Sequence, residues 1–153
     1  MRQSIASAAL IQKEQEGKVL WLAQWSRTWH CFHLVGGHKR PDESFRECLV
    51  REIGEELGLR EGADYEMAAV PTGHMEFTAW SQRTNEETAY TMELFEVRLH
   101  DGPPREKTEA DPENRWLSEA EIRSGRTTDG KPVSPTMAVI LGKIQFLAGE
   151  NEA

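Results

Sequence analysis

Apolar and polar residues fall into alternating blocks along the chain, and the blocks predict a mixture of strands and helices. Residues 5–11 are apolar and rich in small side chains, and residues 19–25 are apolar again after a polar stretch at 12–17. This order predicts two strands joined by a turn. A further apolar run at 31–35 predicts a short strand. It leads into Gly36-Gly37, where we expect a loop, because paired glycines allow conformations and close approaches that a side chain would block.

The strongest helix signal lies at residues 44–57. Ser44 and Glu47 have the spacing of a capping box, in which each side chain bonds the backbone N–H of the other residue. Gly58 follows as a stop signal, since glycine readily adopts the left-handed conformation that ends many helices. The apolar positions between these ends recur every fourth residue, which predicts one buried face: Phe45, Leu49, Ile53 and Leu57.

The second half of the chain begins with two strand candidates. Residues 65–74 are the weaker one, and residues 89–99 are the stronger one, because that run is rich in aromatic and β-branched side chains. The turn residues Asp-Gly-Pro-Pro at 101–104 then predict the start of a charged loop over residues 105–113. A short strand is predicted at 115–117.

Two more helices are predicted toward the C-terminus. Ser118 and Glu121 repeat the capping-box spacing and predict a small helix. Ser134 and Pro135 have the order of an N-cap followed by proline at the first helical position. An amphipathic helix follows, with apolar residues that should pack on the sheet: Met137, Ile140, Leu141, Ile144 and Leu147. This mixture predicts an α/β/α or α+β layered arrangement around a mixed sheet, in one domain of residues 1–153.

Charge narrows the classes of partner. The chain of 153 residues carries 26 Asp and Glu against 18 Lys and Arg, a formal net charge of -8. Binding along a nucleic-acid backbone needs clustered cations, so this balance argues against a nucleic-acid polymer as partner. A phosphate-bearing ligand would instead need a metal cation to bridge it to the protein.

The expected location follows from two features. Cys31 and Cys48 have no short pairing, so we expect two small buried side chains, no disulfide and a reducing compartment. The apolar run near the N-terminus ends at Gln12, too early for a signal-peptide core or a membrane span. We therefore expect a cytoplasmic protein that does not bind a membrane.

Three glutamates share one face of the predicted helix at 44–57. Glu52, Glu55 and Glu56 lie at positions i, i+3 and i+4, a spacing at which like charges repel and weaken a helix. A bound cation would relieve this repulsion, and Mg²⁺ in particular binds carboxylate oxygens, waters and substrate phosphates. The alternative is a solvated acidic face that binds nothing.

The surrounding spacing favours the metal site. Gly37, five residues, Glu43, seven residues and then Arg-Glu-Ile-Gly-Glu-Glu-Leu-Gly-Leu at 51–59 form one long pattern. It resembles the Nudix box, G-x5-E-x7-R-E-U-x-E-E-x-G-U with U a bulky aliphatic residue, and every specified position matches. Val35 departs from the proline that many members have before the two glycines. The resemblance implies the α/β/α sandwich of the Nudix hydrolases (MutT-like), built around a mixed sheet.

The resemblance also implies roles for the residues of the box. Arg51 would pair with Glu43 and orient Glu52, although a plain surface ion pair is the alternative. The Gly37 carbonyl is a candidate metal ligand. One or more Mg²⁺ or Mn²⁺ ions would otherwise be held by three carboxylates: Glu52, Glu55 and Glu56.

The reaction implied by the resemblance is hydrolysis of a diphosphate linkage. The substrate would be a nucleoside diphosphate linked to another moiety, or a nucleoside triphosphate, with the metal neutralising charge and activating water. Glu52, Arg51 and Glu55 are the candidate catalytic residues. Glu52 is the first choice for the general base, although family members differ in which glutamate serves.

Several questions stay open at this point. Glu109 and Glu113 lie in the predicted charged loop, where some family members place a further ligand or base, and a solvated loop is the alternative. The substrate-binding residues are unknown, and homodimers are common among the proteins that the sequence resembles. A catalytically silent module that binds a nucleotide or regulates a partner is the competing interpretation, and the intact glutamates count against it.

Other conspicuous side chains carry weaker signals. His30, Cys31 and His33 could suggest zinc, but successive residues of a strand face opposite sides, which fits packing or a substrate pocket better. Lys39 and Arg40 could contact a phosphate or balance the acidic helix. Some aromatic side chains could stack on a nucleobase, although aromatic residues on strands more often belong to the core: Trp21, Trp25, Trp29, Phe77 and Trp80.

Overall fold

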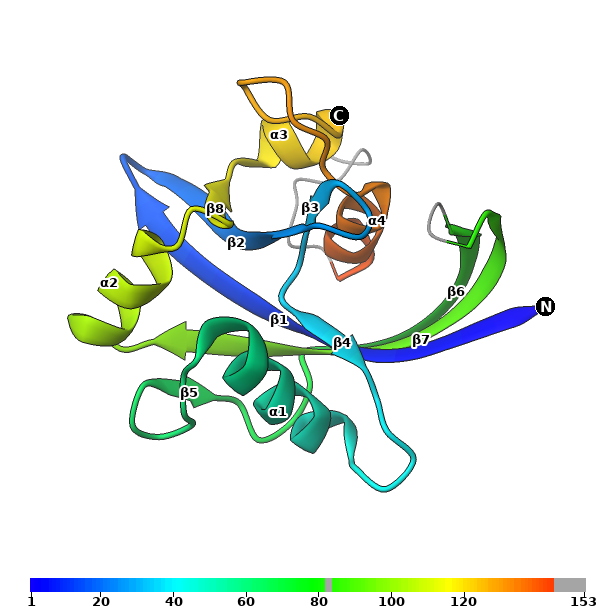
Figure 1. Cartoon of the computed structure of the whole chain (residues 1–153), viewed down its shortest axis with the longest axis horizontal. Coiled ribbons are helices and arrows are strands. Elements are labelled where there is room, and N and C mark those ends of the chain that lie inside the picture. The colour runs from blue at the N-terminus through cyan, green and yellow to red at the C-terminus, as the bar shows by residue number, and fades with distance from the viewer. Residues whose placement is uncertain (82–83, 145–153) are drawn as a thin grey trace.

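Two long parallel strands form the centre of the fold. The computed structural model describes residues 1–81 and 84–144. In it, strand β1 (Arg2–Gln15) pairs in parallel with strand β7 (Glu86–Leu99). Figure 1 shows the two strands crossing the molecule side by side. The predicted strands at 5–11 and 89–99 are confirmed; β1 extends further at both ends, and β7 begins three residues earlier than predicted.

The other strands extend this pair into a mixed sheet. The predicted second strand is β2 (Lys18–Ser26), which is antiparallel to β1. β3 (Cys31–His33) and β8 (Asn114–Leu117) both pair with β2, and β4 (Gly36–His38) pairs with β1. β5 (Tyr65–Met67) and β6 (Gly73–Ser81) both pair with β7. Within the described residues, every strand pairing except β1–β7 is antiparallel.

Strand β1 is buried on both faces, which explains its unbroken apolar run. Ala8 and Leu10 pack in a core with the buried residues of α3 (Glu119–Ser124) and α4 (Pro135–Lys143). Ala9 and Ile11 pack in a second core with α1 (Phe45–Leu57). Helices therefore cover both faces of the mixed sheet, as Figure 1 shows, and the predicted α/β fold is confirmed as an α/β/α sandwich.

Helix α1 begins and ends as its sequence predicts. The Glu47 N–H donates to Ser44 Oγ at 3.0 Å, and the Ser44 N–H donates to the Glu47 carboxylate at 2.8 Å, so both halves of the capping box form. Gly58 ends the helix with a φ of 67°. Lys107 Nζ, from helix α2 (Pro103–Ala110), donates to the Gly58 carbonyl at 3.0 Å. One of the carbonyls at this helix end thus gains a partner from a distant segment.

The charged stretch after the two prolines begins as a helix, so the prediction of a loop over 105–113 was wrong. Proline is tolerated in the first turn of α2, because the N–H groups there have no partner inside the helix. Thr108 Oγ1 donates to the Pro104 carbonyl at 2.9 Å, and Arg105 pairs with Glu109 one turn later at 3.5 Å. Helix α2 contains no large apolar side chain apart from its two prolines, so the sequence shows no apolar periodicity there.

The two glycines after β3 lie in a strand rather than in the predicted loop. Gly36 and Gly37 belong to β4 and face Ala8 and Ser7 of β1. A Cβ on Gly36 would lie 2.1 Å from the Ser7 carbonyl oxygen, so only glycine allows the strands to approach this closely. The predicted strand at 65–74 also divides into β5 and the start of β6, with irregular residues between them.

The predictions for the C-terminal part are largely confirmed. Strand β8 includes the predicted residues 115–117, and α3 begins with both hydrogen bonds of the Ser118–Glu121 capping box. Helix α4 opens with Pro135 and buries Met137, Ile140 and Leu141, as predicted. Ile144 lies just beyond the helix and packs on the same core, whereas Leu147 lies outside the described residues.

Two observations concern the cellular location that the sequence predicts. Cys31 and Cys48 are both buried free thiols. Among the helices within residues 1–81 and 84–144, none is both long and apolar enough to cross a membrane.

The capping box makes a stability prediction with an internal control. Ser44→Ala should lower the free energy of unfolding by about 1 kcal/mol, because the Glu47 N–H loses its acceptor. Ser134 is also an N-cap, but its side chain makes no capping hydrogen bond. Ser134→Ala should therefore cost less than about half as much. Urea unfolding measures both changes, and equal losses would contradict the role given to the Ser44 box.

Candidate active site

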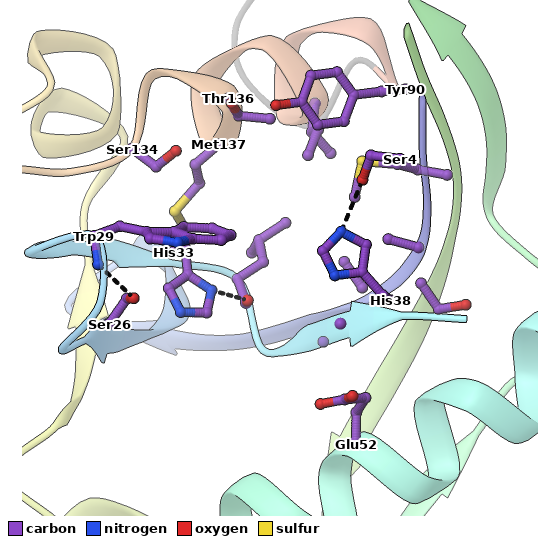
Figure 2. A pocket seen from close by; sticks show the side chains of 18 of the residues that line it. Ser4, Ser26, Trp29, His33, His38, Glu52, Tyr90, Ser134, Thr136 and Met137 are labelled. Carbon is purple, nitrogen blue, oxygen red and sulfur yellow. Dashed lines mark hydrogen bonds between the residues drawn. The ribbon is translucent and has the colours of Figure 1, made fainter. Parts of the chain in front are cut away.

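A cavity of about 700 Å³ lies where strands β1, β3, β4 and β7 meet helices α1 and α4. Figure 2 shows Glu52 entering it from α1, with Trp29, His33 and Met137 on a different side. The charged side chains of its lining come from α1 and the segment just before it, and we call them the charged end: Lys39, Arg40, Arg51, Glu52 and Glu56. The remaining described lining is uncharged and consists of hydroxyl, thiol, imidazole, aromatic and aliphatic side chains.

Glu52 lies against the backbone of β4. It is only 9% exposed, and a Cβ added to Gly37 would come within 2.5 Å of its carboxyl carbon. Residue 37 therefore has to be glycine for Glu52 to keep this position. Burial raises the pKa of Glu52, and the Arg51 guanidinium opposes that shift. The result is a poorly solvated carboxylate in the cavity wall beside Gly37.

Arg51 holds the residues of the box together. Its guanidinium donates to Glu43 at 2.6 and 3.0 Å, to Glu52 at 2.9 Å and to the His38 carbonyl at 3.1 Å. The predicted Arg51–Glu43 pair is therefore present, and the same guanidinium fixes Glu52. Hydrogen bonds from Arg51 lower the pKa of Glu43 to about 2. Both side chains are mostly buried, so removing one would leave the other as an uncompensated charge.

Glu55 and Glu56 have different surroundings. Glu56 lines the cavity, whereas Glu55 is half exposed and contacts Arg51 at 3.4 Å and Arg40 at 4.0 Å. The pKa of Glu56 is raised, first by partial desolvation and then by the charges of Glu55 and Glu113. Desolvation and the two neighbouring carboxylates therefore both disfavour the charged form of Glu56, which a bound cation would stabilise.

A divalent cation fits this donor set. In the part of the chain that the structure describes, no three His, Cys, Asp or Glu side chains form a group that would hold a metal by themselves. Mg²⁺ does not need such a cage, because it binds through one or two carboxylates and takes waters and substrate phosphates as its other ligands. Glu52 and Glu56 both line the cavity and supply carboxylates of this kind.

Glu109 lies away from this cavity. Its carboxylate accepts the Trp116 indole N–H at 2.7 Å and pairs with Lys13 at 3.4 Å and Arg105 at 3.5 Å. These contacts border a separate depression between β1, β2 and β8. The hydrogen bonds and cations together lower the pKa of Glu109 in spite of desolvation, which would raise it. Glu109 therefore lies beside Trp116 and not among the lining residues of the cavity, and its role as a further ligand or base stays a prediction.

Glu113, from the same predicted loop, lies nearer to α1. Its negative charge acts on Glu56, and its own carboxylate pairs with Arg27 at 2.7 Å. Gln24 Nε2 donates to the Glu56 carbonyl at 3.2 Å and to Asn114 Oδ1 at 3.0 Å. Strands β2 and β8 are thereby attached to the last turn of α1, which carries the glutamates.

Strand alternation places Cys31 and His33 as predicted. Both line the cavity, while Phe32 between them is buried in the core. Lys39 and Arg40 also line the cavity. The contact of Arg40 with Glu55 favours the interpretation that it balances the acidic helix.

The aromatic candidates divide between core and cavity. Trp21 is 2% exposed and belongs to the core, whereas Trp29 and Trp80 line the cavity and are 40% and 58% exposed. No local pattern in the sequence indicates a further set of uncharged lining residues, because β1, β7 and the start of α4 bring them together from distant positions: Ser4, Tyr90, Ser134 and Thr136. From the sequence, the alternation of side chains along a strand could have identified only Cys31 and His33 as residues that face the cavity together.

The match to known families is decisive. The NUDIX domain model matches residues 1–137. The chain belongs to the NUDIX family. This confirms both the resemblance read from the box and the expected class of enzyme, a Nudix hydrolase.

Solved structures of this fold are similar to the chain at low sequence identity. An Ap4A hydrolase from C. elegans has a TM-score of 0.63 and 16% identity, over 95% of this chain and 98% of that one. A NUDIX hydrolase from Nitrosomonas europaea has a TM-score of 0.59 and 22% identity, over 95% and 89%. A MutT protein from Methanosarcina mazei Go1 has a TM-score of 0.57 and 21% identity, over 99% and 97%. No curated protein matches the chain. These similarities establish the fold and leave the substrate open.

The Arg51–Glu43 pair makes a prediction about pH. The pKa of Glu43 in the folded protein, about 2, lies below its ordinary value of 4.5, so the pair stabilises the fold above about pH 4.5 and loses this contribution as the pH falls through about 2. Glu43→Gln should therefore lower the free energy of unfolding most at neutral pH, with a difference that shrinks between pH 4.5 and 2. Denaturant unfolding across this range measures it, with Glu14→Gln at the exposed end of β1 as control. A difference that does not change with pH would contradict the assignment.

Proposed function

We propose that this chain is a metal-dependent pyrophosphohydrolase that cleaves a diphosphate linkage in a nucleotide. The substrate class is a nucleoside diphosphate linked to another moiety, or a nucleoside triphosphate. One observation carries the proposal: the box is complete, and Glu52 and Glu56 line the charged end of a cavity whose other end is uncharged. Such a cavity has room for an anionic phosphate chain at one end and a neutral group at the other.

The metal in this proposal is Mg²⁺ or Mn²⁺. Glu52 and Glu56 are its ligands from the cavity wall, and the Gly37 carbonyl is a further candidate. Glu55 is the third carboxylate, held at the rim by Arg51 and Arg40. When bound, the ion supplies charge neutralisation at the phosphoryl oxygens and lowers the pKa of a water.

The residues of the chain supply orientation and proton transfer. Arg51 donates to Oε1 of Glu52, which fixes the carboxylate and leaves Oε2 without this bond. Glu52 is the proposed general base, since burial raises its pKa and a carboxylate with a raised pKa accepts a proton more readily near neutral pH. Lys39 and Arg40 line the same end and are the cations within reach of a phosphate chain.

Further expectations belong to the same proposal. The whole chain, residues 1–153, acts as one Nudix domain in the cytoplasm, where reduced thiols such as Cys31 and Cys48 persist. A homodimer stays a prediction from the family resemblance. The competing function, a silent nucleotide-binding module, has no feature of the cavity in its favour.

A substrate panel tests the proposal. Nucleotide sugars, ADP-ribose, dinucleoside polyphosphates, and normal and oxidised nucleoside triphosphates are incubated with Mg²⁺ or Mn²⁺, and the phosphorylated products are quantified. We expect cleavage of one class, abolished by a chelator. Glu52→Gln and Glu56→Gln should each reduce turnover by about 100-fold or more, because they keep the shape of the side chain and remove its charge.

The control for this panel is Glu66→Gln on strand β5, outside the cavity lining. It should turn over substrate like the parent protein. Normal turnover by Glu56→Gln would remove that residue from the metal site. Metal binding by calorimetry without any cleavage across the panel would favour the silent module.

The contact between Gly37 and Glu52 gives a second test. Gly37→Ala should reduce turnover by about 100-fold, because the new Cβ would displace the Glu52 carboxylate and small misplacements at a reacting centre cost this much. Gly54→Ala is the matched control on α1, since its Cβ would meet nothing nearer than the Leu59 carbonyl at 3.9 Å. Equal turnover in both variants would contradict a role for the position of Glu52.

A further inference from the structure

The uncharged end of the cavity has a defined wall that the box does not supply. It contains Trp29 from the turn after β2 and His33 from β3. Figure 2 shows the Trp29 ring above the His33 ring, with Met137 of α4 pointing toward it. The ring centroids of Trp29 and His33 lie 5.7 Å apart. The two rings are therefore neighbours in one part of the cavity wall.

The hydrogen bonding of His33 determines which of its nitrogens carries the proton. Nδ1 lies 2.7 Å from the Leu34 carbonyl oxygen, and a carbonyl can only accept, so Nδ1 carries the hydrogen. Burial lowers the pKa of His33, which keeps the ring neutral. Nε2 then has a lone pair and no hydrogen. Over residues 1–81 and 84–144, the hydrogen bond to Leu34 is the one that the ring makes, so Nε2 is available as an acceptor in the cavity wall.

His33 is held in place by backbone on both sides. Strand β3 pairs with β2, where His33 lies opposite Gln24. On its other side, the Phe32 N–H donates to the Pro132 carbonyl at 3.0 Å and the Ser134 N–H donates to the Phe32 carbonyl at 2.8 Å. A side chain on such a braced strand is suited to select a ligand, because its position changes little on binding.

Trp29 is presented by a tight turn. His30 has a φ of 53°, its N–H donates to the Ser26 carbonyl at 2.8 Å, and the Trp29 N–H donates to Ser26 Oγ at 3.1 Å. The indole is 40% exposed and lines the cavity. An aromatic side chain in this position supplies apolar contact area to a planar ligand.

We propose that Trp29 and His33 recognise the base of the nucleotide substrate, with the base packed on Trp29 and one of its N–H groups donating to Nε2 of His33. The proposal rests on the proposed function, since it places the phosphates at the charged end. It selects a nucleobase with an unmethylated N–H group.

Binding without catalysis tests the packing on Trp29. Dissociation constants of AMP, GMP, CMP and UMP, which have no diphosphate linkage to cleave, are measured by NMR titration with Mg²⁺ present, and ribose 5-phosphate is the probe without a base. We expect at least one nucleotide to bind tenfold or more tightly than ribose 5-phosphate. Trp29→Leu should weaken that nucleotide by about fivefold or more and leave ribose 5-phosphate unchanged. Trp116→Leu, beside Glu109 and outside the cavity, is the control and should change neither.

A comparison of a base with its methylated analogue tests whether Nε2 of His33 accepts a hydrogen bond from the base. The base that binds best is compared with its analogue in which every N–H of the base is methylated. The parent protein should bind the analogue at least tenfold more weakly, His33→Leu should lose this discrimination, and His33→Asn should keep it, because its amide oxygen also accepts. Circular dichroism confirms that each variant is folded.

The outcomes separate this inference from the proposed function. No preference for a nucleotide over ribose 5-phosphate, equal binding of the methylated analogue, or discrimination that persists in His33→Leu would each overturn it. Base-selective binding without turnover in the substrate panel would support it and overturn the hydrolase instead. Turnover in the substrate panel without base discrimination would support the hydrolase and overturn this inference.

Discussion

The structure depends on the burial of strand β1 on both of its faces. Because Ala8 and Leu10 pack toward α3 and α4 while Ala9 and Ile11 pack toward α1, one strand joins the two halves of the sandwich. Strand β4 pairs with the same segment of β1, and its glycines allow the two backbones to approach closely. The position of the site follows from this strand, since β4 and α1 meet where both contact β1.

Arg51 links the charged side chains of the site. It is mostly buried, and its hydrogen bonds join Glu43, Glu52 and the backbone of His38. A guanidinium suits this position because its fixed fork of donors can bond several acceptors at once. Its single positive charge faces the three carboxylates of Glu43, Glu52 and Glu55, so this cluster has a net negative charge. The same cluster thus stabilises the loop before α1 and leaves negative charge that a bound cation would neutralise.

The cavity combines two kinds of chemistry that come from different parts of the chain. The charged end is local, since its residues lie between Lys39 and Glu56. The uncharged end draws on β1, β3, β7 and α4, which are distant in sequence. Nudix hydrolases of similar fold share only low identity with this chain. The proposed recognition of the base draws on the part of the cavity that is built from distant segments.

Local patterns in the sequence determined the glutamate face, the capping boxes of α1 and α3, and the long strands, because each depends on neighbours within a few residues. Local patterns did not predict α2, where Lys107 contacts the end of α1. They also did not predict β4, because its pairing depends on how closely β1 approaches. The sequence alone predicted which residues could carry the reaction. Only the tertiary structure decided that Glu109 lies elsewhere and that Trp29 and His33 share the cavity, because packing between distant segments sets those distances.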